Sequence, residues 1–362
     1  ARWLSLLDDA AEVPSYDDVP ALLAAARQTG ASVLHPGVGF AAESAALARA
    51  CLEAGLTWVG PSPQALELVT DKLALSRRAA ELSVPVPLTL GPVTNLEELA
   101  QAATQVAGPA MLKTVHGGGG RGVLPLPGSS AGQLRRAWQS LAGLGPLLLQ
   151  ADVPNARHIE VQALADGAGG VMTLGTRECS LQRRAQKIME EAPAPFLAED
   201  LVQELEDWTC LVLGSAGLQG VATCEFLLPH AGTPVLLEVN ARLQVEHAVS
   251  EEVSGMDLVR AQLVLAQGGD LDEVLATCGG SPLPSSRGAG TRLRVDGHAV
   301  EARLYAEDPD TLLPSQVALR ALSIPLSTPD ERAEVASHRP PSLPRLRVER
   351  GTYPGDAPQP AF

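Results

Sequence analysis

The chain has 362 residues, of which 45% are hydrophobic and 19% are charged, and its formal net charge is −15. This composition predicts a globular protein with two or three domains. The acidic balance argues against a nucleic-acid-binding protein, and because no apolar run approaches the length of a membrane span, we expect no membrane protein either.

Residues 1–86 alternate helices with short strands, which is typical of α/β proteins. Asp18 and Pro20 mark a helix start, and Gly30 marks its end. Short buried strands are predicted over 31–34 and 56–59, a second helix is predicted to end near Gly55, and a third is predicted over 71–82.

Residues 87–152 read as a smaller unit that follows a linker marked by Pro85 and Pro87. Helices are predicted over 95–106 and 131–141, and strands over 110–115, 122–125 and 147–150. The first of these strands carries Lys113 and leads into a glycine run.

The glycine run, Gly117–Gly120, fits a GxGxxG pattern when Gly122 is included. A strand follows it where a dinucleotide fold requires a helix, so the pattern does not favour that fold. We predict instead a hairpin whose backbone N–H groups can cover phosphates, and the alternative is a plain flexible hairpin.

Polar and apolar residues alternate along residues 237–246, which is the period of a strand. The polar face of this predicted strand carries Glu238, Asn240, Arg242, Gln244 and Glu246. It offers oxygen ligands that suit Mg²⁺, a guanidinium that suits an oxyanion, and a carboxylate base. A second acid, Glu225, lies on a nearby apolar run. The alternative interpretation is a half-exposed strand with a solvated face.

Two further segments alternate like strands, 157–162 and 298–303, and the first places His158, Glu160 and Gln162 on one face. Residues 177–187 concentrate cations in a protein that has few of them. Such a run is usually a solvated surface. Three polar strands nevertheless suggest a sheet with one ligand-facing side.

These motifs together resemble biotin carboxylases, which are members of the ATP-grasp superfamily. The resemblance covers about residues 14–315 and rests on HPGVGF (35–40), GPSP (60–63), DK (71–72), the Lys113 glycine loop, RHIEVQ (157–162), RECSLQRRAQKIMEEAPAP (177–195), EVNARLQVEHAVSE (238–251) and HAVEARLYAEDP (298–309). The last three strings indicate biotin carboxylases within the superfamily, including the corresponding domains of acyl-CoA, pyruvate and urea carboxylases.

The resemblance implies an α/β protein with an ATP-grasp fold and a partial Rossmann-like N-terminal domain. Residues 1–86 would be a truncated N-terminal domain with its linker, 87–152 the ATP-grasp lid, and 153–362 the ATP-grasp core with a partial C-terminal domain. Both ends look short relative to the family, and 317–347 match it poorly, so we expect a fragment or a degenerate homologue.

The activity implied by the resemblance is that of a ligase, in which ATP phosphorylates bicarbonate and the carboxyphosphate formed carboxylates biotin. The ATP-binding residues would be Lys72, Lys113, Gly117, Gly118, Gly119, Gly120, Gln150, Val153, His158 and Gln182. Two Mg²⁺ or Mn²⁺ ions would be held by Glu225, Glu238 and Asn240. Bicarbonate would be bound by Lys187, Arg242, Gln244 and the Val245 backbone, Glu246 would be its base, and Arg303 would stabilise the biotin ureido oxygen.

The chain departs from the family mainly on the nucleotide side. The family usually has His at Ala185, an acid at Gln150 followed by Lys where Ala151 stands, and Tyr or Cys at Val38. These differences put ATP affinity in question more than the chemistry at bicarbonate.

The partners implied are a biotin carrier domain and a carboxyltransferase, because the chain has no Met-Lys-Met biotin-acceptor motif. A homodimer is a further expectation. Five scattered cysteines without a CxxC pair predict free thiols in the cytoplasm or, alternatively, the mitochondrial matrix. Two other functions stay open: an ATP-grasp ligase that activates another carboxylate, and a truncated, non-catalytic scaffold. The EEAPAP (190–195) and GGGGRG (117–122) strings resemble acyl-CoA carboxylases more than urea carboxylases.

Overall fold

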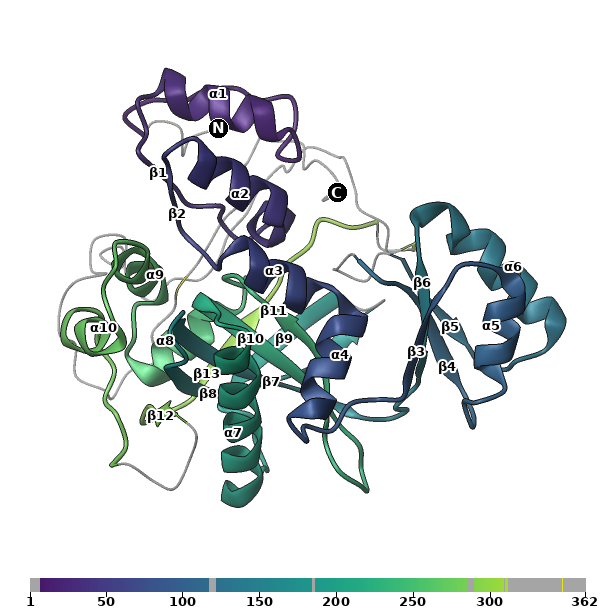
Figure 1. The fold of residues 1–362 in the computed structure, drawn as a ribbon. Coiled ribbons are helices and arrows are strands. Elements are labelled where there is room, and N and C mark those ends of the chain that lie inside the picture. The colour runs from purple at the N-terminus through teal and green to yellow at the C-terminus, as the bar shows by residue number, and fades with distance from the viewer. Residues whose placement is uncertain are drawn as a thin grey trace. The chain divides into compact units, whose positions relative to one another are not determined.

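The computed structural model describes residues 7–116, 122–183, 186–284, 290–308, 310–311 and 347. The chain divides into two compact units, residues 1–302 and 303–362. Every helix and strand described below lies in the first unit and is drawn in Figure 1. The mixture of helices and β-sheets confirms the predicted α/β class.

The N-terminal part of the first unit is a set of helices around a two-stranded parallel sheet. Its elements are α1 (Val19–Gln28), β1 (Val33–Leu34), the 3-10 helix η2 (Phe40–Glu43), α2 (Ala45–Glu53), β2 (Thr57–Trp58), α3 (Pro63–Thr70) and α4 (Lys72–Glu81). Asp18 caps α1 as predicted, by accepting the Ala21 N–H. The prediction of a buried strand at 31–34 is wrong for Val33, which is 40% exposed because β1 pairs with β2 alone.

The junction between α3 and α4 depends on Asp71, whose carboxylate accepts the backbone N–H groups of Leu73 and Ala74 at 2.8 and 3.0 Å. We expect Asp71→Ala to lower the free energy of unfolding by about 1 kcal/mol, because two N–H groups of the first turn lose their acceptor. Asp71→Asn should retain most of the stability. Urea unfolding measures both, and an equal loss in the Asn variant would contradict capping as the cause.

Residues 89–151 form an antiparallel four-stranded sheet covered on one face by two helices, as Figure 1 shows. The elements are β3 (Thr89–Val93), α5 (Leu96–Ala103), β4 (Ala110–Thr114), β5 (Val123–Leu126), α6 (Ala131–Leu141), the 3-10 helix η3 (Ala142–Leu144) and β6 (Leu147–Ala151). The strand order is β3-β6-β4-β5. Leu99 and Leu134 of the helices pack with Leu112 and Leu149 of the sheet in one buried cluster. All the predicted elements of this region are present, and β3 is an additional strand.

The larger sheet carries most of the predicted site. Its region contains β7 (Arg157–Asp166), β8 (Val171–Arg183), β9 (Gln186–Ala192), α7 (Glu199–Ser215), β10 (Gln219–Leu228), β11 (Val235–Asn240), α8 (His247–Ser254), α9 (Leu258–Ala266), α10 (Leu271–Cys278), β12 (Thr291–Arg292) and β13 (Ala299–Ala302). The strand order is β11-β10-β7-β8-β9-β13, and β12 pairs with β8. Ile159, Val161 and Phe226 join the core that includes residues of α7. Their neighbours in the strand alternation, Glu160 and Glu225, therefore point to the other face.

One sequence prediction about this sheet is wrong, because the strand that begins before Glu238 does not continue to Glu246. β11 ends at Asn240, which pairs with Thr223 of β10, and the preceding residue of β10 pairs with β7 alone. After Asn240 the chain leaves the sheet although β10 continues to Gln219, and Glu246 is the residue that precedes helix α8. The alternation in 241–246 thus belongs to a loop.

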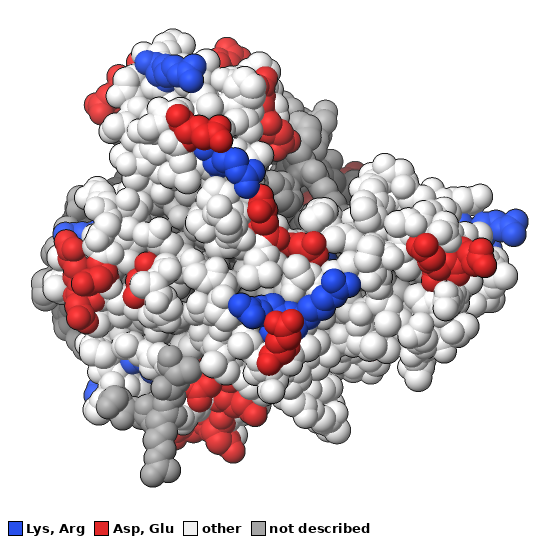
Figure 2. Space-filling view, in the orientation of Figure 1, with Lys and Arg blue, Asp and Glu red and all other residues white. Residues whose placement is uncertain are grey.

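Lys and Arg side chains on the visible face are interspersed with Asp and Glu, as Figure 2 shows. Among the residues that the structure describes, no helix is both long and apolar enough to cross a membrane.

Candidate active site

A cavity of about 240 Å³ lies beside the end of β11. Its lining is formed by Phe40, Glu43, Ser44, Val69, Thr70, Lys72, His116, Glu238, Val239 and Asn240. His116 directly precedes the glycine run, so the start of the predicted phosphate loop lies at the same cavity as Glu238. Gly117–Gly120 themselves lie outside the described residues.

Two lysines predicted to grip phosphates, the half-buried Lys72 and the buried Lys113, lie near this cavity. Burial lowers the pKa of Lys72 and of Lys113, and the Glu238 carboxylate opposes that shift at both. Lys113 Nζ donates to Gln150 Oε1 at 2.6 Å, and Gln150 Nε2 donates to Thr89 Oγ1 at 3.0 Å. The amide at position 150, where the family usually has an acid, is thus a neutral partner for a buried ammonium group.

The predicted metal ligands come from two paired strands. Glu225 of β10 and Glu238 of β11 are directly opposite each other in the ladder, and Asn240 Nδ2 donates to Glu225 Oε1 at 2.8 Å. Two carboxylates and an amide oxygen are the hard oxygen donors that Mg²⁺ prefers, so the residues present fit a divalent ion.

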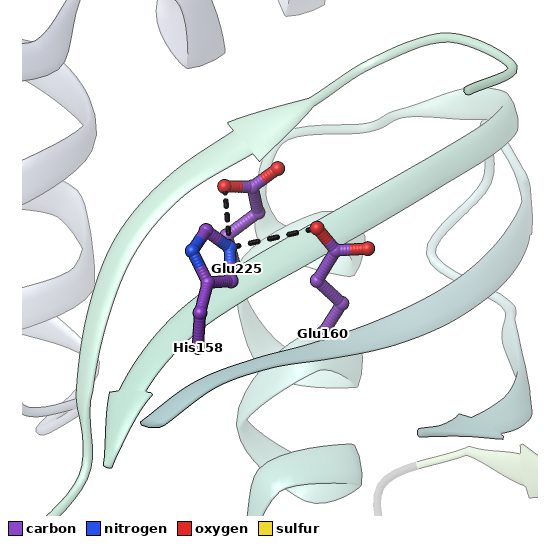
Figure 3. Close-up of side chains that lie close together, drawn as sticks. All are labelled: His158, Glu160 and Glu225. Atoms are coloured by element: carbon purple, nitrogen blue, oxygen red, sulfur yellow. Dashed lines mark ion pairs between the residues drawn. The ribbon is translucent and has the colours of Figure 1, made fainter. Parts of the chain in front are cut away.

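A second group of possible metal ligands is drawn in Figure 3: His158, Glu160 and Glu225, whose ligand atoms lie within 4.8 Å of one another. His158 Nε2 lies 2.8 Å from Glu225 Oε2 and 3.5 Å from Glu160 Oε1. Burial lowers the pKa of His158, but the two carboxylates outweigh it and raise the pKa to about 10. The imidazolium thus compensates the charge of these two acids.

Lys187 of β9 lies at the centre of a cluster of charged side chains. Its Nζ donates to Glu160, to Glu225 Oε1 at 3.1 Å and to Glu246 Oε1 at 2.6 Å. Burial lowers the pKa of Lys187, but the carboxylates outweigh it and raise the pKa well above its usual value. Burial also acts to raise the pKa of Glu160, yet Lys187 and Arg177 lower it well below the usual range. Lys187 and Glu160 therefore form a charged pair at neutral pH.

Arg242 is held next to the metal ligands. Its Nε donates to Glu43 Oε1 at 3.0 Å, its Nη2 donates to Asn240 Oδ1 at 3.3 Å, and its Nη1 donates to the Leu243 carbonyl at 3.3 Å. The cation is thereby fixed at the cavity that Glu43 and Asn240 line. Burial raises the pKa of Glu43, although Arg242 opposes the shift.

Of the other predicted residues, Gln244 and Gln182 contact Glu225 and His158. Gln244 Nε2 donates to Glu225 Oε1 at 3.1 Å, and Gln182 Nε2 lies 3.0 Å from His158 Nδ1. Val153 is half-buried, and Val245 is 44% exposed. Arg303 is the first residue of the second unit, and its role stays a prediction.

Three residues of the site were not assigned a role from the sequence: the half-buried Glu43 and the buried Glu160 and Arg177. Glu160 lies on the polar face of the predicted strand 157–162, so the sequence indicated its position but not its contacts. Arg177 is fully buried in β8, but in the sequence it stands between Thr176 and Glu178 at the start of the cation-rich run 177–187, so no local signal distinguished it from a surface charge.

Comparison with known proteins agrees with this geometry. Residues 1–66 match the biotin carboxylase N-terminal domain, and residues 71–274 match the ATP binding domain of the carbamoyl-phosphate synthase L chain. The biotin carboxylase of Pseudomonas aeruginosa is 39% identical over 325 residues, which cover 86% of this chain and 69% of that protein. The chain belongs to the biotin carboxylase family. It is therefore an ATP-dependent ligase of the class that carboxylates biotin, as the resemblance implied.

Solved structures of this family confirm the ATP-grasp fold. The biotin carboxylase domain of the Hydrogenobacter thermophilus 2-oxoglutarate carboxylase was determined as a dimer with MgADP, ADP and bicarbonate. It is 31% identical, with a TM-score of 0.79, and the match covers 90% of this chain and 71% of that one. The chain spans about half of a longer relative, the Mycobacterium leprae biotin-dependent acyl-coenzyme A carboxylase alpha3 subunit, of which 53% is covered at 35% identity.

Proposed function

We propose that this chain's first unit binds ATP with Mg²⁺ or Mn²⁺ in the cavity beside β11 and binds bicarbonate against Lys187, Arg242 and Gln244. The observation that carries the proposal is the contact of Lys187 Nζ with Glu246 Oε1 at 2.6 Å. It places a fixed cation beside a buried carboxylate, the pair needed to bind an oxyanion and accept its proton.

The burial of the proposed anion-binding side chains supports bicarbonate over a larger carboxylate. Glu246 and Gln244 are each 3% exposed, so these two side chains are shielded from bulk water. In such surroundings each hydrogen bond to an anion is stronger than in water. Divalent ions on Glu225, Glu238 and Asn240 would neutralise the charge of the phosphates when bound.

The biotin is proposed to come from a carrier domain, with a carboxyltransferase as the further partner. The relative from Mycobacterium leprae is named as a biotin-dependent acyl-coenzyme A carboxylase subunit, which supports this assignment. The dimer of the Hydrogenobacter thermophilus domain supports a homodimer. Five buried free cysteines support a reducing compartment, for which we propose the cytoplasm.

The test is ATP cleavage by the purified chain with bicarbonate and free biotin added separately and together. We expect cleavage that requires bicarbonate, together with incorporation of labelled bicarbonate into biotin. Cleavage that ignores both additions but responds to another carboxylic acid would favour a different ATP-grasp ligase. Nucleotide binding without any cleavage would favour the scaffold.

The metal assignment predicts the behaviour of Glu238→Ala. We expect calorimetry to show that Mg²⁺ strengthens ATP binding to the wild type and that the variant loses at least about tenfold of this enhancement, since even indirect supports of metal ligands cost that much. Glu53→Ala, an exposed acid on α2, is the matched control and should keep the enhancement. Equal Mg²⁺ dependence in wild type and Glu238→Ala would refute the assignment.

A further inference from the structure

Arg177 is a fully buried arginine in the middle of β8. Its guanidinium makes hydrogen bonds to five side chains. Nε and Nη2 reach Glu160 Oε2 at 3.0 and 2.8 Å, Nη1 donates to Gln162 Oε1 at 2.5 Å and to Ser250 Oγ at 2.9 Å, and Nη2 donates to Thr223 Oγ1 at 3.1 Å and to Gln244 Oε1 at 2.6 Å. Each N–H group of the guanidinium therefore has an acceptor.

Stability alone does not account for this arrangement. Removing a guanidinium from water costs several kcal/mol, and apolar residues of similar volume often replace buried ion pairs at no loss. Arg177 has a single carboxylate partner, Glu160, and four neutral ones. Each neutral acceptor would also have to be satisfied in other ways if Arg177 were absent. The free-energy cost of burying Arg177 therefore indicates that this residue has a function in the site.

The partners of Arg177 come from four elements near the proposed bicarbonate position, whereas the bicarbonate ligand Lys187 lies on β9. β7 supplies Glu160 and Gln162, β10 supplies Thr223, the loop after β11 supplies Gln244, and α8 supplies Ser250. Glu160 in turn accepts from Lys187. Arg177 thus connects directly to one proposed bicarbonate ligand and, through Glu160, to another.

The contact with Gln244 fixes which end of its amide faces the site. A guanidinium can only donate, so the oxygen of Gln244 must point toward Arg177. The NH₂ group then points the other way, where it now donates to Glu225 Oε1. A donor on that side can bind an oxyanion, whereas the reversed amide would present an oxygen to it.

We propose that Arg177 is a positioning residue for bicarbonate: it orients the Gln244 amide and, through Glu160, holds the Lys187 ammonium, without contacting the anion itself. This inference rests on the proposed function, because it names the support of the same bicarbonate site. It assigns Arg177 no part in ATP binding. Loss of Arg177 should consequently change the use of bicarbonate and leave the use of ATP nearly unchanged.

The experiment compares Arg177→Met with Arg292→Met in the full chain. Arg292 is the matched control because it also pairs with a single buried carboxylate, Glu206 of α7, from a strand that pairs with the other end of β8. For Arg177→Met we expect the KM for bicarbonate to rise about tenfold or more, equivalent to about 1.4 kcal/mol. The KM for ATP should stay within about twofold of the wild type.

Arg292→Met should lose stability but keep both KM values. If the two variants change stability, kcat and both KM values alike, Arg177 is a structural residue and the inference is overturned. Should Arg177→Met fail to fold, Arg177→Lys decides, because it keeps the buried charge but cannot hold Gln244 and Glu160 together in the planar geometry of a guanidinium. A wild-type KM for bicarbonate in Arg177→Lys overturns the inference. A wild type without bicarbonate-dependent cleavage overturns the proposed function itself.

Discussion

Glu246→Gln is expected to abolish bicarbonate-dependent ATP cleavage while ATP binding persists. Glu246 is buried before helix α8 and pairs with Lys187, so it is held where a base for bicarbonate is proposed. An amide of the same shape cannot accept the proton, and loss of a positioned general base costs about 10²–10⁴ in rate. Steady-state ATP cleavage with saturating bicarbonate measures the loss, and calorimetry with MgATP measures the retained binding.

Glu252→Gln is the control for this experiment, since Glu252 is exposed on the same helix. It should keep the wild-type rate. If Glu246→Gln retained more than about a tenth of that rate, the loss would fall short of a general base and the role of Glu246 would be refuted.

Lys187→Met is expected to lower the free energy of unfolding by about 3–5 kcal/mol, the usual cost of removing one partner from a buried ion pair. Lys187 is 14% exposed and faces Glu160, Glu225 and Glu246. Without the ammonium these three carboxylates repel one another in a largely buried setting. Urea unfolding at neutral pH measures the loss.

The double variant Lys187→Met/Glu246→Gln separates repulsion from lost packing. Removing one carboxylate should restore part of the stability that Lys187→Met lost, so the two changes should not add. Strictly additive losses would contradict charge repulsion as the cause. Lys187→Arg should keep the charge and most of the stability.

Much of the fold could be predicted because local signals agree with the final structure. The helix 131–141 is present as α6 with the predicted bounds. The helices α7 to α10 were not predicted, and two other elements, α3 and β3, were missed because local signals there mislead. The GPSP string looks like a turn, but Ser62 caps α3 and Pro63 is its first residue. Gly91 and Pro92 argue against a strand, yet β3 tolerates them because it lies at the edge of its sheet.

The candidate site was predictable in its residue types and less so in its contacts. Periodicity identified Glu238 and Asn240, whose place on β11 the structure shows. It could not reveal that the strand ends there, because the alternation continues through 241–246 while the pairing of β11 with β10 stops at Asn240. The contact between Glu43 and Arg242 joins residues 199 positions apart, and no local pattern encodes it.

The span of sequence over which Arg177 collects its partners has a consequence for biosynthesis. Its acceptors run from Glu160 to Ser250, so the guanidinium lacks part of its hydrogen-bonding shell until α8 has left the ribosome. The sheet of residues 89–151, in contrast, packs only with strands and helices from the same range of the sequence in its hydrophobic cluster. Because contacts distant in sequence form slowly, we expect this smaller sheet to mature first. The proposed bicarbonate site is then among the last parts of the first unit to become ordered. A nascent chain that stalls before α8 would expose an incompletely formed sheet with charged side chains to chaperones.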